Sequence, residues 1–412
     1  MFRVLIVGAG PTGALLANAL RQELQQKVTI VMWDKSRGTG GRMSTSRSPD
    51  DPSCIADLGA QYLTVTPEYA SKHSRYYKDL LEAGLIHSLS GRMSTSRSPD
   101  DPSCIADLGA QYLTVTPEYA SKHSRYYKDL MEAGLIHSLS GKIEGIKGKY
   151  FNPETKNYVT PKGISSIVKH FIKKSGASLQ VDHHLSRVDV EEESVGKPKL
   201  SVSAATASQT DSGYDAVVLT MPVPQILKQQ GFTQQCLEKD SGLLEDLKAV
   251  QYSSRFALGL FYPPGVTIDV PYVGKYVDGN LCIRWVSVDN EKRGVDGKTH
   301  GPSVVVHTSV PFGIKHIDMA KSDVQPIIMN HLNDVIPNLP EPSSIKCVGW
   351  RYSQVSKPLT GAPGHVTIAE HPSYLLLAAG DGFSHSNFDG CIASAESVLA
   401  RLLEFHNKTL QL

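Results

Sequence analysis

No stretch of the sequence approaches the roughly 20 consecutive apolar residues that a helix needs to cross a bilayer. There is no excess of one charge either, because 42 basic and 41 acidic side chains leave a formal net charge of +1. Lysine and arginine form no run of the kind that binds nucleic acid or lipid. We therefore expect a soluble protein with no membrane span and no nucleic-acid partner, which holds any phosphate group at a local site.

The patterns of metal sites and disulfide frameworks are also missing. The six cysteines include no Cys-x-x-Cys pair, and the 15 histidines show no His-Glu-x-x-His or similar spacing. Both absences predict reduced thiols and no metal. Because 412 residues are too many for a single hydrophobic core, we expect two interleaved domains.

One segment of the chain is duplicated in tandem. Residues 42–91 recur as residues 92–141 with a single difference, Leu81 against Met131. Solenoids need at least about three units with diverged terminal copies, so a recent exon duplication or an error in gene assembly explains the repeat better. A single position in the fold can accommodate only one copy of this 50-residue segment. We therefore predict that the duplicated segment 92–141 is extruded or redundant, so that one copy forms a poorly packed excursion.

The N-terminus carries a dinucleotide-binding motif. Val4–Val7 is an apolar run typical of a central parallel strand, and a helical pattern continues through Leu20. Between them, Gly8 permits a tight turn, Gly10 lets the backbone approach a pyrophosphate, and Gly13 lets helix and strand pack closely. The free amides and the dipole at the helix start would bind phosphates without a basic side chain.

A second strand, Val28–Trp33, ends in Asp34, 21 residues after Gly13. A carboxylate at this position accepts hydrogen bonds from ribose hydroxyls and disfavours a 2′-phosphate. The motif therefore fits FAD or NAD and fits NADP poorly. The alternative is a glycine-rich turn with an ordinary surface aspartate.

Two motifs that follow favour FAD over NAD. In Gly40-Gly41-Arg42 the glycines would let backbone amides crowd the pyrophosphate, while the Arg42 guanidinium offers donors to phosphate or flavin; a solvated loop is the alternative. In the strand-like segment 57–62, the Gln61 amide can hydrogen-bond to the isoalloxazine and Tyr62 can lie against a ring. Core packing of Tyr62 is the competing interpretation.

A further motif lies near the C-terminus. Tyr374–Gly380 is predicted as a last strand, followed by Asp381 and by Asn387–Gly390 at the start of an amphipathic helix that runs from Cys391 to Phe405. Asp381 is placed to accept bonds from ribityl hydroxyls, and the helix start at Gly390 can face the flavin pyrimidine. FAD is long enough to need contacts from both ends of the chain, so the pairing of N-terminal and C-terminal motifs discriminates best between FAD and NAD.

The middle of the chain is less informative. A buried strand over 214–222 is predicted to lead from the FAD domain into a second domain, which must supply the walls of a substrate site. Arg284, Trp285 and Phe312 are weak candidates for those walls, and ordinary packing or a solvated arginine is the better interpretation of each.

These motifs together resemble the renalases, a family of two-domain flavoproteins of the amine-oxidase type. The resemblance rests on segments 4–13, 33–35, 40–43, 56–62, 219–224, 252–262, 310–313 and 380–392. It implies non-covalent FAD, and it implies Thr12, Arg42, Gln61 and Tyr62 as FAD contacts. The duplication leaves open whether Arg92, Gln111 and Tyr112 take the places of the last three. Lys35, next to Asp34, is a further candidate contact for the cofactor.

The predicted fold class is α/β, with a Rossmann-like FAD-binding domain interleaved with a smaller α+β substrate domain, as in p-hydroxybenzoate hydroxylase and the amine oxidases. We assign residues 1–66, 155–223 and 362–412 to the FAD-binding domain. Residues 67–91 and 224–361 are assigned to the substrate domain.

The resemblance also implies a reaction, in which 1,2- and 1,6-dihydro isomers of NAD(P) are oxidised to NAD(P)+ by hydride transfer to flavin while O2 is reduced to H2O2. The side chains predict no acid or base for this reaction. An amine oxidase for catecholamine-like substrates, or a secreted signalling protein with a flavoprotein fold, are the alternatives. Secretion is implied by the resemblance without an obvious cleavable signal peptide, because cleavage would delete the first strand and its glycines; a cytoplasmic protein is the alternative.

Overall fold

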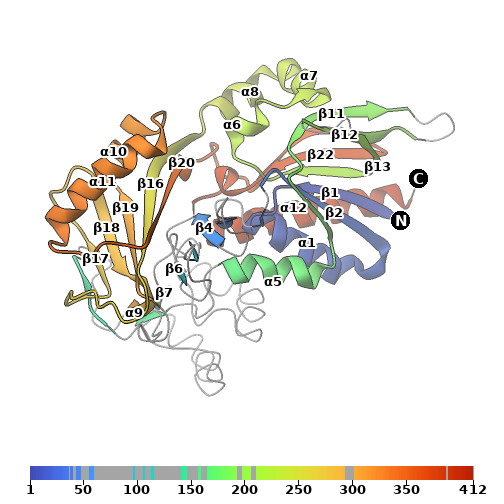
Figure 1. Cartoon of the computed structure of the whole chain (residues 1–412). Coiled ribbons are helices and arrows are strands. Elements are labelled where there is room, and N and C mark those ends of the chain that lie inside the picture. The colour runs from blue at the N-terminus through green and yellow to red at the C-terminus, as the bar shows by residue number, and fades with distance from the viewer. Residues whose placement is uncertain are drawn as a thin grey trace. The chain divides into compact units, whose positions relative to one another are not determined.

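The computed structural model describes residues 1–36, 38–39, 43–47, 55–59, 96–97, 105–106, 113–115, 141–145, 156–158, 165–192, 197–205, 210–292, 301–386 and 388–411. The chain divides into two compact units (Figure 1). The first unit contains Met1–Gly41, Val168–Tyr252 and Val355–Leu412, and the second contains Arg42–Ile167 and Ser253–Gln354. Mixed sheets and helices confirm the predicted α/β class.

A six-stranded sheet forms the centre of the first unit. Its strands are, in order, β10 (Ser178–Val181), β2 (Val28–Asp34), β1 (Phe2–Val7), β14 (Ala216–Leu219), β22 (Tyr374–Ala379) and β21 (His365–His371). The first five strands are parallel, and β21 pairs with β22 antiparallel. Parallel strands direct their carboxyl ends to one edge of a sheet, so β1, β2, β14 and β22 all end there.

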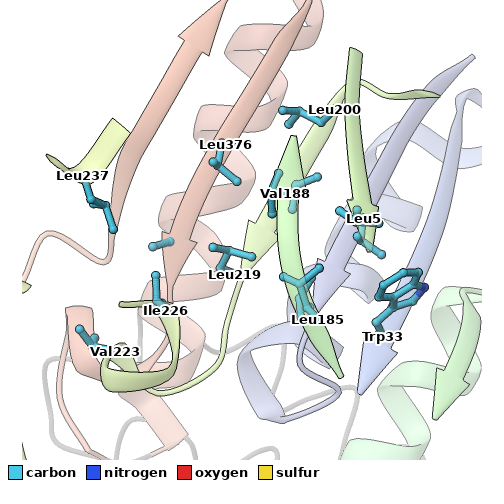
Figure 2. Packing of buried hydrophobic residues seen from close by; sticks show 14 of the residues in the cluster. Leu5, Trp33, Leu185, Val188, Leu200, Leu219, Val223, Ile226, Leu237 and Leu376 are labelled. Carbon is cyan, nitrogen blue, oxygen red and sulfur yellow. The ribbon is translucent and has the colours of Figure 1, made fainter. Parts of the chain in front are cut away.

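Alternate residues of β1 face opposite layers. Ile6 lies against α1 (Pro11–Leu24), which packs beside α12 (Phe388–Thr409) (Figure 1). Leu5 faces the other layer, an antiparallel sheet built from β13 (Thr210–Tyr214), β12 (Lys199–Ala204), β11 (Leu185–Glu191) and β15 (Gln230–Gly231). Figure 2 shows this core, in which Leu5 and Trp33 share a cluster with Leu185 and Val188. Covering both faces explains why β14 and the Val4–Val7 part of β1 are apolar throughout.

Helices complete the first unit. These are α5 (Ser165–Ser175), α6 (Val223–Ile226), α7 (Phe232–Lys239) and α8 (Ser241–Lys248). Ile226, Leu237 and Leu247 of the last three are buried in the same cluster as β1 and β14. The compact units therefore divide the chain after Tyr252 and not at the predicted boundary at residue 223. The assignment of domains by function stays a prediction.

The second unit is built on another six-stranded sheet. Its order is β20 (Ser344–Lys357), β16 (Gln251–Phe261), β19 (Ser303–Thr308), β18 (Ile283–Val288), β17 (Gly274–Tyr276) and β8 (Ile143–Glu144). Helices α10 (Val310–His316) and α11 (Lys321–Val335) bury Phe312 and Ile328 in one cluster with Val286 and Val306 of the sheet. The short helix α9 (Asp289–Lys292) follows β18.

Strands from both repeat copies are described. β3 (Met43–Arg47), β4 (Ile55–Gly59), β5 (Ser96–Arg97) and β6 (Ile105–Ala106) form one antiparallel sheet, in which β4 of the first copy pairs with β5 of the second. β7 (Leu113–Val115) pairs with β9 (Lys156–Tyr158). The remainder of both copies lies outside the described residues, so the predicted excursion of one copy stays a prediction.

Within the described residues, no helix is long and apolar enough to cross a membrane. The same part of the chain holds no group of three metal-binding side chains. Among the described residues, Cys236, Cys282, Cys347 and Cys391 are free thiols. Burial raises the pKa of the Cys282 thiol to about 12 and that of Cys347 to about 11.

Candidate dinucleotide site

The turn after β1 is shaped by glycines. Gly8 has a φ of +113°, and its N–H donates to the carbonyl of Trp33 on β2 at 2.7 Å. A Cβ on Gly13 would lie 2.1 Å from the carbonyl oxygen of Gly8, a distance at which atoms overlap. Strand and helix can therefore approach this closely because Gly13 has no side chain.

Helix α1 begins with backbone donors that have no acceptor within the helix. Gly10 is its N-cap residue, in an extended conformation (φ −88°, ψ −174°), and no side chain caps the helix. Pro11 occupies the first helical position, where no N–H is needed. The amides of the first turn, at Thr12 and Gly13, have no intrahelical acceptor. A helix start of this kind attracts anions, and its open amides suit a phosphate.

Asp34 ends β2 beside this turn and is 5% exposed. One carboxylate oxygen accepts from the N–H of Ala9 and the other from the N–H of Ser36, both at 2.8 Å. Burial raises the pKa of this carboxyl above its ordinary value of 3.8, and the hydrogen bonds from Ser36 and Ala9 partly offset the increase. The two backbone donors and the Ser36 side chain thus fix the orientation of the carboxylate, whose roughly four lone-pair sites leave capacity for a ligand hydroxyl.

Thr220 joins the N-terminal motif to the C-terminal one. Following β14, it donates through Oγ1 to the carbonyl oxygens of Val7 and Gly8, at 2.9 and 3.1 Å. A Cβ on Gly8 would lie 2.5 Å from this Oγ1, and one on Gly380 would lie 3.4 Å from the Thr220 carbonyl oxygen. The ends of β1 and β22 therefore meet on either side of Thr220. This is the juxtaposition that a long dinucleotide requires and that the sequence predicts from distant motifs.

Asp381 follows Gly380, which has a φ of +125°, and is 3% exposed. Its Oδ2 accepts from the hydroxyl of Ser386 at 3.1 Å. The N–H of Gly380 donates to Oγ of the buried Ser394 on α12 at 2.8 Å, and that hydroxyl donates to the carbonyl of Gly364 at 2.6 Å. The turn that presents Asp381 is thus anchored by the helix behind it.

The start of α12 packs tightly against the chain that precedes it. A Cβ on Gly390 would lie 1.9 Å from the carbonyl oxygen of His385, and the Gly390 carbonyl accepts from the Ser384 hydroxyl at 2.8 Å. Gly390 therefore has a packing role at this helix start. The sequence predicts it as a cofactor contact, and that prediction is untested.

Of the remaining predicted site residues, Thr12 and Lys35 are described by the structure and the others are not. Thr12 is buried at the second position of α1, and Lys35 is exposed. Outside the described residues lie Gly41, Arg42, Gln61, Tyr62, Arg92, Gln111 and Tyr112. Which repeat copy supplies contacts to a cofactor therefore stays open.

The weak candidates in the second unit have ordinary structural roles. Arg284 is exposed and pairs with Asp278 at 3.1 Å. Phe312 lies in the core cluster under α11. Trp285 is 2% exposed and packs edge-on against Tyr276, with ring centroids 4.7 Å apart. Arg284 and Phe312 thus follow the interpretation that the sequence favours, a solvated arginine and a packed aromatic ring.

Sequence reasoning missed Thr220, Ser386 and Ser394. Each binds backbone or carboxylate groups that lie close in the fold, and Thr220 reaches partners more than 200 residues away. A recognisable signal exists for Thr220 alone, because it directly follows a strand that pairs with β1. Isolated serines carry no such signal.

Comparisons with known proteins agree with this geometry. Residues 6–80 match the model of the NAD(P)-binding Rossmann-like domain, and residues 116–403 match that of the flavin containing amine oxidoreductases. The chain is 38% identical to renalase of Mus musculus over 405 residues, which cover 98% of this chain and all of the mouse protein.

Two solved structures have a similar fold. A putative protoporphyrinogen oxidase from Exiguobacterium sp. 255-15 matches with a TM-score of 0.60 and 13% identity, over 98% of this chain and 99% of its own. An oxidoreductase from Methanosarcina mazei matches with a TM-score of 0.54 and 14% identity, over 97% of this chain and 100% of its own. At these identities the likeness concerns the fold.

Proposed function

Because this chain belongs to the renalase family of flavin-containing amine oxidoreductases, whose cofactor is FAD, we propose that it oxidises isomeric dihydronicotinamides with O2 as acceptor. The substrates would be 1,2- and 1,6-dihydro NAD(P), and the products NAD(P)+ and H2O2. The substrate loses a hydride, and that hydride together with one proton reduces O2 to H2O2. The choice of substrate rests on the family resemblance.

The observation that supports the FAD site most strongly is the meeting of the Gly8 turn and the Gly380 turn at Thr220. A side chain at Gly8 would overlap the Thr220 hydroxyl, and one at Gly13 would overlap the Gly8 carbonyl, so the close packing of this turn requires both glycines. The open amides at the start of α1 suit the pyrophosphate, and Asp34 suits the adenosine ribose. Asp381 lies on the neighbouring turn and suits the ribityl hydroxyls. The residues present therefore fit FAD, which we propose is bound non-covalently.

FAD supplies the hydride acceptor that amino-acid side chains lack. The remaining task of the protein is to bind and orient the substrate and to exclude water. Loss of a hydride restores the aromaticity of a nicotinamide ring, so orientation can suffice without a general base. We accordingly propose no side chain as acid or base.

Oxidation of an amine is the second candidate, because the matched family model describes amine oxidoreductases. The two functions are distinguished by mixing the oxidised holoenzyme with each class of compound in the absence of oxygen. The loss of the visible absorbance of oxidised flavin reports reduction of the cofactor. We expect 1,2- and 1,6-dihydro NAD(P) to bleach the flavin within seconds, while catecholamines leave it oxidised. Bleaching by amines alone would reverse the assignment.

We further propose that the protein is secreted with its N-terminus retained. Removal of the N-terminus would delete β1 and the turn from Gly8 to Gly13, on which the cofactor site depends. N-terminal sequencing of protein recovered outside cells should therefore find β1 intact. Mature protein that begins after Gly13 would contradict retention, and detection solely inside cells would favour the cytoplasmic alternative.

A signalling role that does not need the flavin can be distinguished from oxidase activity with a variant that cannot bind FAD. Gly10→Val places a branched side chain where the backbone must approach the pyrophosphate. We expect this variant to lose FAD and every oxidase-dependent effect. Cellular effects that persist in a flavin-free Gly10→Val protein would support a signalling function for the fold.

A further inference from the structure

The turn that carries Asp381 is connected to two of the four places where the chain passes between the compact units. The chain leaves the first unit after Tyr252 and returns to it at Val355. Both residues belong to the first unit, and both reach the segment Asp381–Phe383.

The connection to Val355 runs through Ser386. The N–H of Val355 donates to Oγ of Ser386 at 2.8 Å, and this hydroxyl donates to Oδ2 of Asp381 at 3.1 Å. One hydroxyl thus acts as acceptor for the returning strand and as donor to the carboxylate. Four residues further on, the N–H of Leu359 donates to the carbonyl of Gly382 at 2.8 Å.

The connection to Tyr252 is a close packing contact. The Tyr252 hydroxyl accepts from the N–H of Val223 at 3.2 Å, and it lies so near Gly382 that a Cβ there would be 2.6 Å from it. Tyr252 and Val355, which flank the segment Ser253–Gln354 of the second unit, therefore both contact the turn that presents Asp381 or a residue bonded to it.

We propose that Ser386 is a positioning residue that orients the Asp381 carboxylate toward the ribityl chain of FAD. Through the same hydroxyl, binding of FAD at Asp381 is coupled to the order of the returning strand at Val355. The inference rests on the proposed function insofar as Asp381 binds FAD. Ligand hydroxyls on the carboxylate fix its orientation, and a fixed carboxylate holds the Ser386 hydroxyl in the orientation that accepts from Val355. FAD binding therefore orders the strand that leads back from the second unit.

The test uses the FAD-loaded protein and three variants. Ser386→Ala removes the bridge, and Ser386→Thr keeps a hydroxyl. Ser322→Ala is the matched control, because Ser322 also donates to an aspartate, Asp323, at 3.0 Å, but on an exposed part of α11. Two quantities are measured: the rate at which FAD fluorescence appears on dilution, and hydrogen exchange at the Val355 amide with FAD bound and after its removal.

We expect Ser386→Ala to release FAD about tenfold faster, as the loss of one hydrogen bond to a charged group predicts. Exchange at Val355 should slow on FAD binding in the wild type and in Ser386→Thr. In Ser386→Ala it should be fast in both states, while amides of β22 remain protected. The β22 amides separate this local effect from general unfolding, and Ser322→Ala should match the wild type.

The inference would be overturned if Ser386→Ala released FAD at the wild-type rate. It would also be overturned if FAD still slowed hydrogen exchange at the Val355 amide in this variant. General loss of β22 protection in Ser386→Ala moves the test to Ser386→Thr, in which fast exchange independent of FAD would likewise overturn it. A wild-type protein that holds no FAD would instead overturn the proposed function.

Discussion

At the scale of single residues, the turn after β1 depends on positions that have no side chain. A Cβ at Gly8 or Gly13 would overlap neighbouring protein atoms, and the contact at Gly13 is the tighter of the two. The carboxylate of Asp34 is buried beside this turn and held by two backbone amides. Small changes here should affect both cofactor binding and the stability of the fold.

Gly13→Ala should weaken FAD binding at least about tenfold and lower the free energy of unfolding by about 1–3 kcal/mol, as overpacking does. The reason is the 2.1 Å distance between a Cβ at this position and the Gly8 carbonyl oxygen. FAD titration and urea unfolding measure the two effects. Gly242→Ala in α8 is the control, since its Cβ would lie 3.5 Å from the nearest atom, and a stabilisation of about 0.5–1 kcal/mol is expected. Equal FAD affinity in Gly13→Ala and wild type would refute the packing argument.

Asp34→Asn should weaken FAD binding about tenfold, because an amide nitrogen would replace an oxygen that faces the N–H of Ala9 or Ser36. Burial raises the pKa of Asp34, so the folded, FAD-free protein binds this proton more tightly than the unfolded chain does. Its contribution to stability is present below pH 3.8 and is lost as the pH rises through the raised pKa.

The difference in unfolding free energy between wild type and Asp34→Asn, measured from pH 4 upward, tests the sign of this effect. The wild type should lose stability relative to the variant as the pH rises. A difference that is independent of pH, or that changes in the opposite direction, would contradict the raised pKa. Asp246→Asn, on the exposed side of α8, should match the wild type in FAD affinity.

At the scale of elements, the sequence predicts best those that are apolar on both faces. The strands over Val4–Val7, Val28–Trp33 and Tyr374–Gly380 are confirmed as β1, β2 and β22. The sequence also predicts a single strand over Leu179–Val190, and this prediction is wrong because the segment forms two strands. Asp182 adopts a φ of +60° and turns the chain, so that β10 and β11 belong to different sheets. A polar residue between two half-buried strands gives no clear signal of such a turn.

The site divides in the same way. The glycine motif and Asp34 are local in sequence, and the structure places them together as predicted. Thr220 and Ser386 act through partners that the fold brings close, and the only signal in the sequence is the position of Thr220 directly after a buried strand. The contacts expected from Arg42 and Gln61 lie outside the described residues.

Two histidines at helix α12, His406 on the helix and His365 on β21 beside it, should make the first unit sensitive to acid. His365 shares a hydrogen bond with Ser397 of this helix at 2.7 Å, and His406 packs on Phe2 with ring centroids 4.7 Å apart. Burial, with Arg401 nearby, lowers the pKa of His365, and burial also lowers that of His406. The stability that the neutral rings contribute is present above pH 6.5 and is lost as the pH falls through the lowered pKa values.

His365→Gln and His406→Gln should therefore each flatten the fall of the thermal midpoint between pH 8 and pH 5. Differential scanning calorimetry at several pH values measures the slope. His184→Gln, at an exposed position between β10 and β11, serves as the control and should keep the wild-type slope. Parallel curves for wild type and both buried-histidine variants would show that these rings do not cause the acid sensitivity.

At the scale of the whole molecule, the tandem repeat predicts that 50 residues can be removed without loss of the fold. Residues 92–141 repeat residues 42–91 with one substitution, so removing them leaves every repeated segment present once. The variant without residues 92–141 has 362 residues, from 412 minus 50. It should bind FAD as the full chain does and unfold at the same or a higher temperature.

Loss of flavin from that shorter variant would show that both copies are needed, against the prediction that one is redundant. An intact mass of the native protein gives the complementary result. It should correspond to either 412 or 362 residues, and the latter would mean that the duplication is absent from the protein made in cells.

The central claim is that backbone donors and carboxylates at the ends of β1, β2 and β22 hold one FAD molecule. The absorbance spectrum of the purified protein, calibrated by the FAD released on denaturation, tests it most directly. We predict a yellow protein with about one FAD per chain, which Gly13→Ala loses more readily. A colourless protein that takes up no added FAD would contradict the account.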